Sequence, residues 1–512
     1  MQGLPAIDHA DPGSPGARRR VVIVGGGLSG ASFAILLSRY GNSALDILIV
    51  EPRAEPGRGL AYSATDPDHR LNGPLEPHAI DPARPGELRA WCEADGILER
   101  DPEAMLPSGC VFLRRSDYGR FLASQVAAHA ANARTGATIA HVRDTAVSAG
   151  LREGRLAVRT ASGTEYAADL LVVATGNPVP RLQPPFRPEH DGHPRIVGNP
   201  LDTPRLAAIA PDARVLVVGT GLTALDVLST LVRRGHRGPV RVVSRRGLRP
   251  RPHAPDVLGA APRAPSDDTP LDRIMAEVPP FVQALGEGRA LAGLVRALRA
   301  EIRRNEAAGG TWHGPFDLVR DAVWRIWPGL PARDKRRFLK RLRVWYDIHR
   351  FRAPPMNEAL VGQAEARGTV RFEQARVTSV DAPLRDGPVR VGLAGRDAPA
   401  REDEFDYVVN CTGLDTASGY LQNPFLQSLA GQGLLCPDES GLGFRVGADG
   451  EAVARGGGVQ PRIRVVGPLS AGSHGDPLGG VYITAQIRRM LPSVLGLLET
   501  PGPGAGNSCA AS

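Results

Sequence analysis

Two stretches of the chain carry the same glycine-rich turn in the same setting. The first, VVIVGGGLSG, covers residues 21–30, and the second, VLVVGTGLTA, covers residues 215–224. Each follows a run of β-branched residues and precedes a stretch of helix-compatible composition, which is the strand, turn and helix of a dinucleotide-binding unit. The turns lie about 200 residues apart, far beyond a solenoid period, so they predict two domains of like architecture.

The first turn contains Gly25, Gly27 and Gly30, which permit the tight turn, the approach of a pyrophosphate and the contact of helix with strand. The helix after the turn presents unpaired N–H groups and a positive dipole end to phosphates. We expect this helix over residues 28–40, before Gly41. The next strand runs into Glu51, whose carboxylate is placed to accept hydrogen bonds from ribose hydroxyls. A glycine turn without a ligand is the alternative, but strand, helix and acid together favour a binding site.

The second turn differs from the first at the end of its following strand. Its small residues are Gly219, Gly221 and Ala224, with alanine tolerated at the third position. The next strand ends in Ser244, Arg245 and Arg246 in place of an acid. Arginine makes charge-assisted, bidentate bonds to phosphate, so this site is predicted to bind NADPH more than NADH. Solvated loop charges are the alternative, which the glycine turn upstream disfavours.

Composition narrows the classes of function. The 512 residues leave room for two or three domains. The net charge of +8 suits anionic cofactors and substrates as well as nucleic acid, but the arginines are spread along the chain without a nucleic-acid-binding motif, so we expect no nucleic acid as partner. The five cysteines form no C-x-x-C pair and leave an odd one, which predicts neither a disulfide framework nor a metal site and favours a reducing cytoplasm.

The ends and the most apolar stretch of the chain carry no membrane signal. The stretch VVIVGGGLSGASFAILL is shorter than the roughly 20 apolar residues of a spanning helix, and its glycines would weaken one, so no membrane span is expected. The beginning of the chain has no apolar core of the kind a secretory signal needs, and we expect a disordered tail there.

A helical, arginine-rich segment follows the second turn at about residues 267–352. Within it, four apolar residues recur at helical spacing, which predicts a helix face packed on its neighbours with arginines in solvent; they are Leu339, Leu342, Trp345 and Tyr346. Two apolar strands that run into Thr-Gly, DLLVVATG and DYVVNCTG, are expected to mark the crossings between the domains.

These motifs together resemble the FAD/NAD(P)-binding flavoproteins with two dinucleotide-binding domains, a group that includes NADPH-dependent flavin monooxygenases and N-hydroxylases. The resemblance rests on both glycine turns, Glu51, GRGLAYSATDPDHRLN (57–72), RRSDYGRFL (114–122), ATG (174–176) and TG (412–413). It implies that the first turn holds FAD and the second NADPH. It also implies further residues at the cofactors, namely Arg58, Asn72, Gly176, Gly413, Gly467 and Asp476. By the same analogy, the helix after Leu478 would aim its N-terminus at the flavin, where its dipole stabilises negative charge.

The expected fold is therefore α/β, with two Rossmann-like dinucleotide-binding domains, the second inserted in the first, and a helical insertion. The predicted order is a disordered tail (1–18), the first part of the FAD-binding domain (19–177), the NADPH-binding domain (178–405) with the helical insertion at about 267–352, the return of the FAD-binding domain (406–497) and a second disordered tail (498–512).

Two departures from the wider group bear on the reaction. The missing C-x-x-C pair disfavours the disulfide reductases, which pass electrons to a dithiol. No F-x-G-x-x-x-H fingerprint of the Baeyer-Villiger enzymes is found. The leading hypothesis is an NADPH-dependent FAD monooxygenase that hydroxylates a small molecule with molecular oxygen. The alternative is an NADPH-driven reductase or oxidase that passes electrons to a quinone, a partner protein or oxygen, and a third hypothesis is a nucleic-acid- or partner-binding protein on a degenerate flavoprotein scaffold.

The sequence does not identify the catalytic residues. Three histidines are weak candidates for managing protons, namely His253, His349 and His474. A structural histidine is the better interpretation of the first two. His474 has the stronger claim, since it lies in a glycine-rich loop of the kind that carries function.

Overall fold

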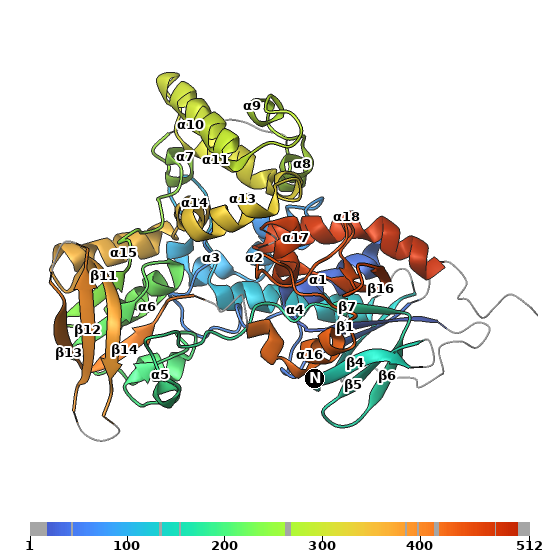
Figure 1. Ribbon diagram of the computed structural model, residues 1–512, viewed down its shortest axis with the longest axis horizontal. Helices are drawn as coiled ribbons and strands as arrows, with labels where there is room; N and C mark the ends of the chain where they lie inside the picture. Colours follow the sequence, from blue (N-terminus) through green and yellow to red (C-terminus); the bar gives the residue numbers. More distant parts are fainter. Residues whose placement is uncertain are drawn as a thin grey trace, which may run out of the picture.

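The computed structural model describes residues 18–41, 45–132, 136–152, 155–261, 268–383, 387–396, 399–413, 419–476 and 478–499. Two sheets lie at opposite ends of the molecule, with helices packed on them and a third, helical lobe above (Figure 1). The parallel strands are almost continuous runs of buried Val, Ile and Leu, which is the pattern of a sheet covered on both faces.

The first sheet has six strands in the order β15-β16-β7-β1-β2-β3. These strands are β1 (Arg19–Val24), β2 (Leu45–Val50), β3 (Thr138–Val142), β7 (Leu170–Val173), β15 (Glu451–Val453) and β16 (Val459–Val465), all parallel except β15. The expected first helix is confirmed as α1 (Leu28–Tyr40), capped by Gly41. It packs on α4 (Arg115–Ala131) and on the last helix, α18 (Gly480–Glu499). The contact between α1 and α18 brings the two ends of the described chain together.

Smaller elements surround this sheet. A three-stranded antiparallel sheet of β4 (Ala146–Arg152), β5 (Arg155–Thr160) and β6 (Glu165–Ala168) packs on α16 (Pro424–Gly431). The remaining elements at this sheet are α2 (Glu87–Ala94), α3 (Ile97–Arg100), α17 (Ala471–His474) and the short 3₁₀ helices Glu76–His78, Pro102–Ala104, Gly419–Gln422 and Gly467–Ser470. A further 3₁₀ helix, Pro188–His190, contacts Phe186 in the core of the second sheet.

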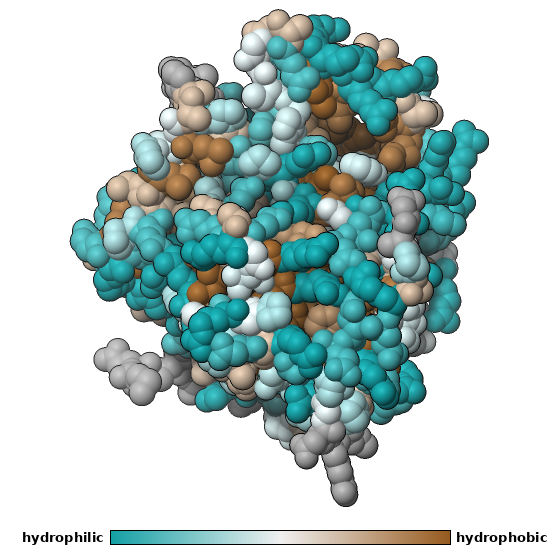
Figure 2. Space-filling view, turned by 90° about the vertical axis from the view of Figure 1, so that its left-hand side faces the viewer, coloured by the Kyte–Doolittle hydropathy of each residue, from teal (hydrophilic) through white to brown (hydrophobic). Residues whose placement is uncertain are grey.

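The second sheet has seven strands in the order β13-β12-β11-β10-β9-β14-β8. They are β8 (Ile196–Val197), β9 (Val215–Val218), β10 (Val240–Ser244), β11 (Val370–Asp381), β12 (Val389–Gly395), β13 (Arg401–Phe405) and β14 (Tyr407–Asn410). The helix of the second glycine turn, α6 (Leu222–Arg233), packs on α15 (Pro355–Ala366), and α5 (Thr203–Ala207) precedes β9. Figure 2 faces this end of the molecule, where hydrophilic residues dominate and apolar ones gather mainly in the upper half.

The helical lobe contains α8 (Pro270–Met275), α9 (Pro280–Gln283), α10 (Leu291–Ala307), α11 (His313–Asp321), α12 (Val323–Ile326), α13 (Ala332–Arg337), a π-helical turn (Phe338–Leu342) and α14 (Arg343–Arg350); α7 (Pro255–Leu258) leads into it. The helices from α8 to α14 thus span Pro270 to Arg350. The prediction that Trp345 packs on a neighbouring helix is wrong, since this residue is 44% exposed. The π-helical turn before it has more residues per turn than an α-helix and so rotates the following residues away from the predicted face.

Two predicted boundaries differ from the structure. The return to the first domain, predicted at residue 406, starts too early, because β14 pairs with β9 and β8 and therefore belongs to the second sheet. Val408 and Val409 are fully buried there. The predicted C-terminal tail also starts too early, since α18 continues to Glu499; residues 1–17 and 500–512 lie outside the described residues. No helix among the described residues has the length and apolarity needed to cross a membrane.

Candidate functional site

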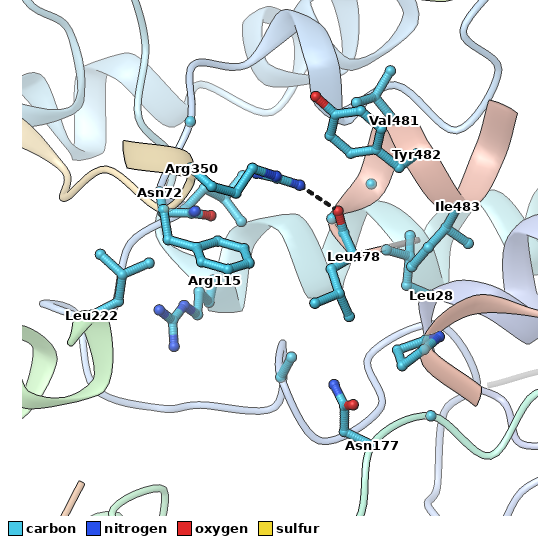
Figure 3. A pocket seen from close by; sticks show the side chains of 18 of the residues that line it. Leu28, Asn72, Arg115, Asn177, Leu222, Arg350, Leu478, Val481, Tyr482 and Ile483 are labelled. Carbon is cyan, nitrogen blue, oxygen red and sulfur yellow. Dashed lines mark hydrogen bonds between the residues drawn. The ribbon is translucent and has the colours of Figure 1, made fainter. Parts of the chain in front are cut away.

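A single large cavity joins the two sheets and the helical lobe. Its volume is about 2050 Å³, larger than the roughly 300–1,000 Å³ of an ordinary ligand pocket. The first residue of each glycine-turn helix, Leu28 of α1 and Leu222 of α6, lines it, and Figure 3 shows both facing the same space. Both helices begin at an extended glycine, Gly27 or Gly221, without a side-chain cap. Their first N–H groups are therefore free for an anion.

Two positions of the first turn accept only glycine. Gly25 has φ of +102°, and a Cβ atom there would lie 2.4 Å from the carbonyl oxygen of Ala174. A Cβ atom on Gly30 would lie 1.9 Å from the carbonyl oxygen of Gly25. Gly27 approaches Gly59, whose own Cβ would lie 2.8 Å from the Gly27 Cα. The backbone is thus bare where a pyrophosphate would contact it.

The carboxylate of Glu51 is fixed at the end of β2. Its side chain is buried, and Oε2 accepts a hydrogen bond from the Gly26 N–H at 2.9 Å. Oε1 accepts from the backbone N–H of Arg53 at 3.1 Å and from its Nη1 at 3.0 Å. A carboxylate has about four acceptor positions. Glu51 also lines the cavity, so one position is left for a ribose hydroxyl.

The second turn repeats the first in its backbone. Gly219 has φ of +119°, and a Cβ atom there would lie 2.1 Å from the carbonyl oxygen of Cys411. Ala224 is fully buried against the sheet. At the end of β10, Ser244 Oγ accepts from Thr220 Oγ1 at 3.0 Å. The two arginines after it, Arg245 and Arg246, are exposed and do not line the cavity, which leaves their guanidinium groups open to solvent.

The residues implied by the resemblance separate into two groups. Arg58, Asn72 and Gly176 line the cavity. Gly413, Gly467 and Asp476 do not, although Pro468 beside Gly467 does. Gly467 has φ of +77° and donates its N–H to Gln486 Oε1 at 2.9 Å, which anchors its loop to α18. The carboxylate of Asp476 is buried in an ion pair with Arg350 at 2.9 Å.

The three candidate histidines lie in three different settings. His253 is buried and lines the cavity, and burial together with the charge of Arg352 lowers its pKa to about 3. His349 does not line the cavity and donates from Nδ1 to the Trp345 carbonyl at 2.7 Å. His474 lies behind the cavity wall, where Nε2 donates to the Gly447 carbonyl at 3.2 Å and Nδ1 accepts from Gln486 Nε2 at 2.9 Å. Of the three candidate histidines, only His253 is therefore placed to contact a ligand in the cavity.

We predict that His474 makes the protein sensitive to acid. Burial lowers its pKa from 6.5 to about 4, so the unfolded chain binds more protons than the folded chain between these values. The stability contributed by His474 is therefore at its full value above pH 6.5, and it falls by about 3 kcal/mol as the pH drops from 6.5 through 4. In His474→Gln, which keeps a donor for Gly447, the free energy of unfolding in urea should fall less between pH 7 and pH 4. Equal pH slopes in the two proteins would contradict the prediction.

Residues that the sequence did not single out line the side of the cavity formed by the helical lobe. Arg320 Nη1 and Nε bind Asp317 and Asp321 at 2.9 Å each, and Tyr482 donates to Asp321 at 2.6 Å. The 3-residue spacing of Asp317 and Arg320 on α11 was the available signal, but helical charge pairs are usually solvated. Here they close a wall between the lobe and α18.

The comparisons with known proteins agree with this arrangement. Residues 22–178 match the family model described as FAD-NAD(P)-binding. Among curated proteins no significant match exists. Solved structures of similar fold include the ornithine hydroxylase PvdA of Pseudomonas aeruginosa, with 17% identity over 94% of this chain and 100% of that one and a TM-score of 0.58.

Two further structures extend the likeness. The ornithine N-hydroxylase KtzI of Kutzneria, solved with reduced FAD, NADP⁺ and L-ornithine, is 15% identical over 94% of this chain and 99% of that one, with a TM-score of 0.59. The cadaverine monooxygenase DfoA of Erwinia amylovora, solved with FAD, is 14% identical over 97% and 99%, with a TM-score of 0.60.

Residues 22–178 are thus an FAD-NAD(P)-binding domain, and the chain as a whole has the fold of a class of two-domain flavoproteins. Within that class, it shares its fold with flavin monooxygenases. The expected fold and an FAD-NAD(P)-binding domain at the first glycine turn are confirmed.

Proposed function

We propose that the protein is an NADPH-dependent FAD monooxygenase that hydroxylates a small molecule. The observation that carries the proposal is the opening of both glycine-turn helices, at Leu28 and Leu222, onto one cavity. FAD on the first turn and NADPH on the second would direct their reactive rings into a shared space. When bound, the two cofactors supply hydride transfer and the reduction of oxygen.

The residues of the chain hold and enclose the reactants. Glu51 would bind a ribose hydroxyl, and the bare backbone at Gly25 and Gly27 would receive the pyrophosphate. The cavity continues under the helical lobe, where Ile274, Leu318 and Pro315 offer apolar contacts. The part of the cavity under the helical lobe is the proposed substrate site, since excluding water there favours hydroxylation of the substrate over release of hydrogen peroxide. The fold shared with amine-hydroxylating enzymes supports oxygen insertion. A location in the cytoplasm stays part of the proposal.

Reoxidation of the reduced enzyme tests the reaction type. The protein is reduced with NADPH without oxygen, mixed with oxygenated buffer and followed by its visible absorbance. We expect a transient band that belongs to neither oxidised nor reduced flavin. Direct return of the oxidised spectrum, with one hydrogen peroxide formed per NADPH even in a screen of small amines and phenols, would instead support the alternative reductase or oxidase.

The exposed arginines after β10 are predicted to select NADPH. Removing both in Arg245→Ala/Arg246→Ala should raise the KM for NADPH at least tenfold and leave that for NADH unchanged, because a charge-assisted hydrogen bond contributes about 1.5–3 kcal/mol. Arg371→Ala is the matched control, since it removes an exposed arginine beside Arg241 at the opposite end of the same sheet. An equal rise of both KM values would show a loss of fold and not of phosphate recognition.

A further inference from the structure

A histidine outside the sequence motifs stands at the cavity wall beside the start of α18. His78 ends the 3₁₀ helix Glu76–His78, lines the cavity and is 8% exposed. Its Nδ1 lies 2.8 Å from the carbonyl oxygen of Pro74. A carbonyl oxygen only accepts, so Nδ1 carries a proton, and in the neutral ring Nε2 is left with a lone pair.

The direction of Nε2 follows from the atoms on either side of it. A Cβ atom on Gly73 would lie 3.3 Å from Cε1 of His78, and one on Gly480 would lie 3.6 Å from Cδ2. Nε2 is bonded to both of these ring carbons. Gly73 and Gly480 line the cavity as well, so the ring presents its Nε2 corner between two residues that have no side chain to cover it.

The ring is held rigidly in this position. The hydroxyl of Tyr118 donates to the His78 carbonyl at 2.8 Å, and the two rings meet edge to face with centroids 5.6 Å apart. Tyr62 packs on the same tyrosine at 4.8 Å. An acceptor fixed in this way binds a partner without further loss of side-chain entropy.

The ring is uncharged at neutral pH. Burial is the main cause of its lowered pKa, and the positive charge of Arg350 on α14 acts in the same direction. The bond to Pro74 and the carboxylate of Glu76 oppose this shift without cancelling it. No hydrogen bond to Nε2 is formed by any residue that the structure describes, so the acceptor is left for a ligand.

We propose that His78 is a ligand-binding residue whose Nε2 accepts a hydrogen bond from an N–H or O–H group held at the N-terminus of α18. The assignment of that space to flavin and substrate rests on the proposed function. Two sources supply such a donor, the ring system of the cofactor and the substrate. In either case Nε2 of His78 favours a ligand group that donates a hydrogen bond and disfavours a carboxylate, because two acceptors that face each other lose their hydrogen bonds to water.

The test compares His78 with a matched histidine. His129 on α4 also donates from Nδ1 to the carbonyl four residues before it, at 2.9 Å, but it does not line the cavity. The FAD-loaded variants His78→Phe and His129→Phe are compared for their visible spectrum and for the release of FAD, read from its fluorescence. His78→Gln, which offers an amide oxygen as acceptor, tests rescue.

Chemical labelling of the purified holoenzyme gives a second readout that does not depend on turnover. Diethyl pyrocarbonate reacts with the neutral nitrogen of an accessible imidazole, and mass spectrometry locates the product. If the donor belongs to the cofactor, we expect His78 to be protected, and His78→Phe to shift the spectrum and release FAD roughly five- to tenfold more readily, as for a lost hydrogen bond. His78→Gln should restore both.

If the donor belongs to the substrate, the two readouts reverse. His78 is then labelled in the holoenzyme, and because its pKa is lowered, the labelling rate begins to fall only at a lower pH than that of a free imidazole. The visible spectrum and the FAD release of His78→Phe match those of His129→Phe. Absence of labelling together with an unchanged spectrum and FAD release in His78→Phe would overturn the proposal. A protein that purifies without FAD would contradict the proposed function, whereas labelling of His78 in that sample would still support an open acceptor.

Discussion

Alanine at Gly25 is expected to abolish stable binding of FAD, with an affinity loss of more than about 100-fold. The backbone there has φ of +102°, and the new Cβ would lie 2.4 Å from the carbonyl oxygen of Ala174. Strain of this kind costs about 1–3 kcal/mol for a non-glycine residue. The clash adds to it, and relief requires the turn to move away from the phosphate position. The measurement is the dissociation constant of FAD, obtained from the quenching of flavin fluorescence.

Two other variants separate loss of binding from loss of fold. Gly163→Ala has similar strain, with φ of +91°, but no atom lies within 4 Å of its Cβ, so this protein should retain FAD. Gly27→Ala has an ordinary φ of −72° and places a methyl group at the start of α1, facing the cavity. It should fold normally and bind FAD more weakly. Wild-type affinity in both glycine-turn variants would contradict the placement of FAD.

The glycine turns could be predicted because their chemistry is local. Gly25 and Gly219 each permit a turn with positive φ, and a helix starts three residues after each of them. The charged residues at the end of the next strand, an acid in the first unit and two arginines in the second, lie within the same short stretches of sequence. Local signals of this kind identified the fold and the first helix correctly.

The rest depended on contacts between distant segments. DLLVVATG and DYVVNCTG are alike as sequences, yet β7 joins the first sheet and β14 the second, a difference set by the strands on either side. Asp476 came from a motif, but its carboxylate binds Arg350, which is 126 residues away. His78 carried no motif at all, and its place at the cavity depends on Gly480 at the other end of the chain.

Arg70 shows the same limit within a motif that the sequence did identify, HRLN at residues 69–72. The resemblance implied that Asn72 lies at a cofactor, but the side chain of Arg70 in the same segment is 2% exposed and binds both carboxylate oxygens of Asp101 at 2.8 Å. It also donates to the Phe112 carbonyl at 3.0 Å. The neighbouring Asn72 lines the cavity, so the buried ion pair fixes the wall from behind.

Replacing Arg70 by methionine is therefore expected to lower the free energy of unfolding in urea by about 3 kcal/mol, the low end of the range for a broken buried ion pair. The buried carboxylate of Asp101 loses its two shortest contacts and keeps those to Arg114, at 3.1 and 3.2 Å. The partly exposed pair of Arg89 and Glu76, at 2.7 Å, is the control, and Arg89→Met should cost less than about 1 kcal/mol. Adding Asp101→Asn to Arg70→Met removes the buried carboxylate charge that Arg114 alone compensates, and should recover part of the loss. If the double variant were no more stable than Arg70→Met alone, uncompensated charge would not be the cause, and the loss would have to come from packing of the side chain against the cavity wall.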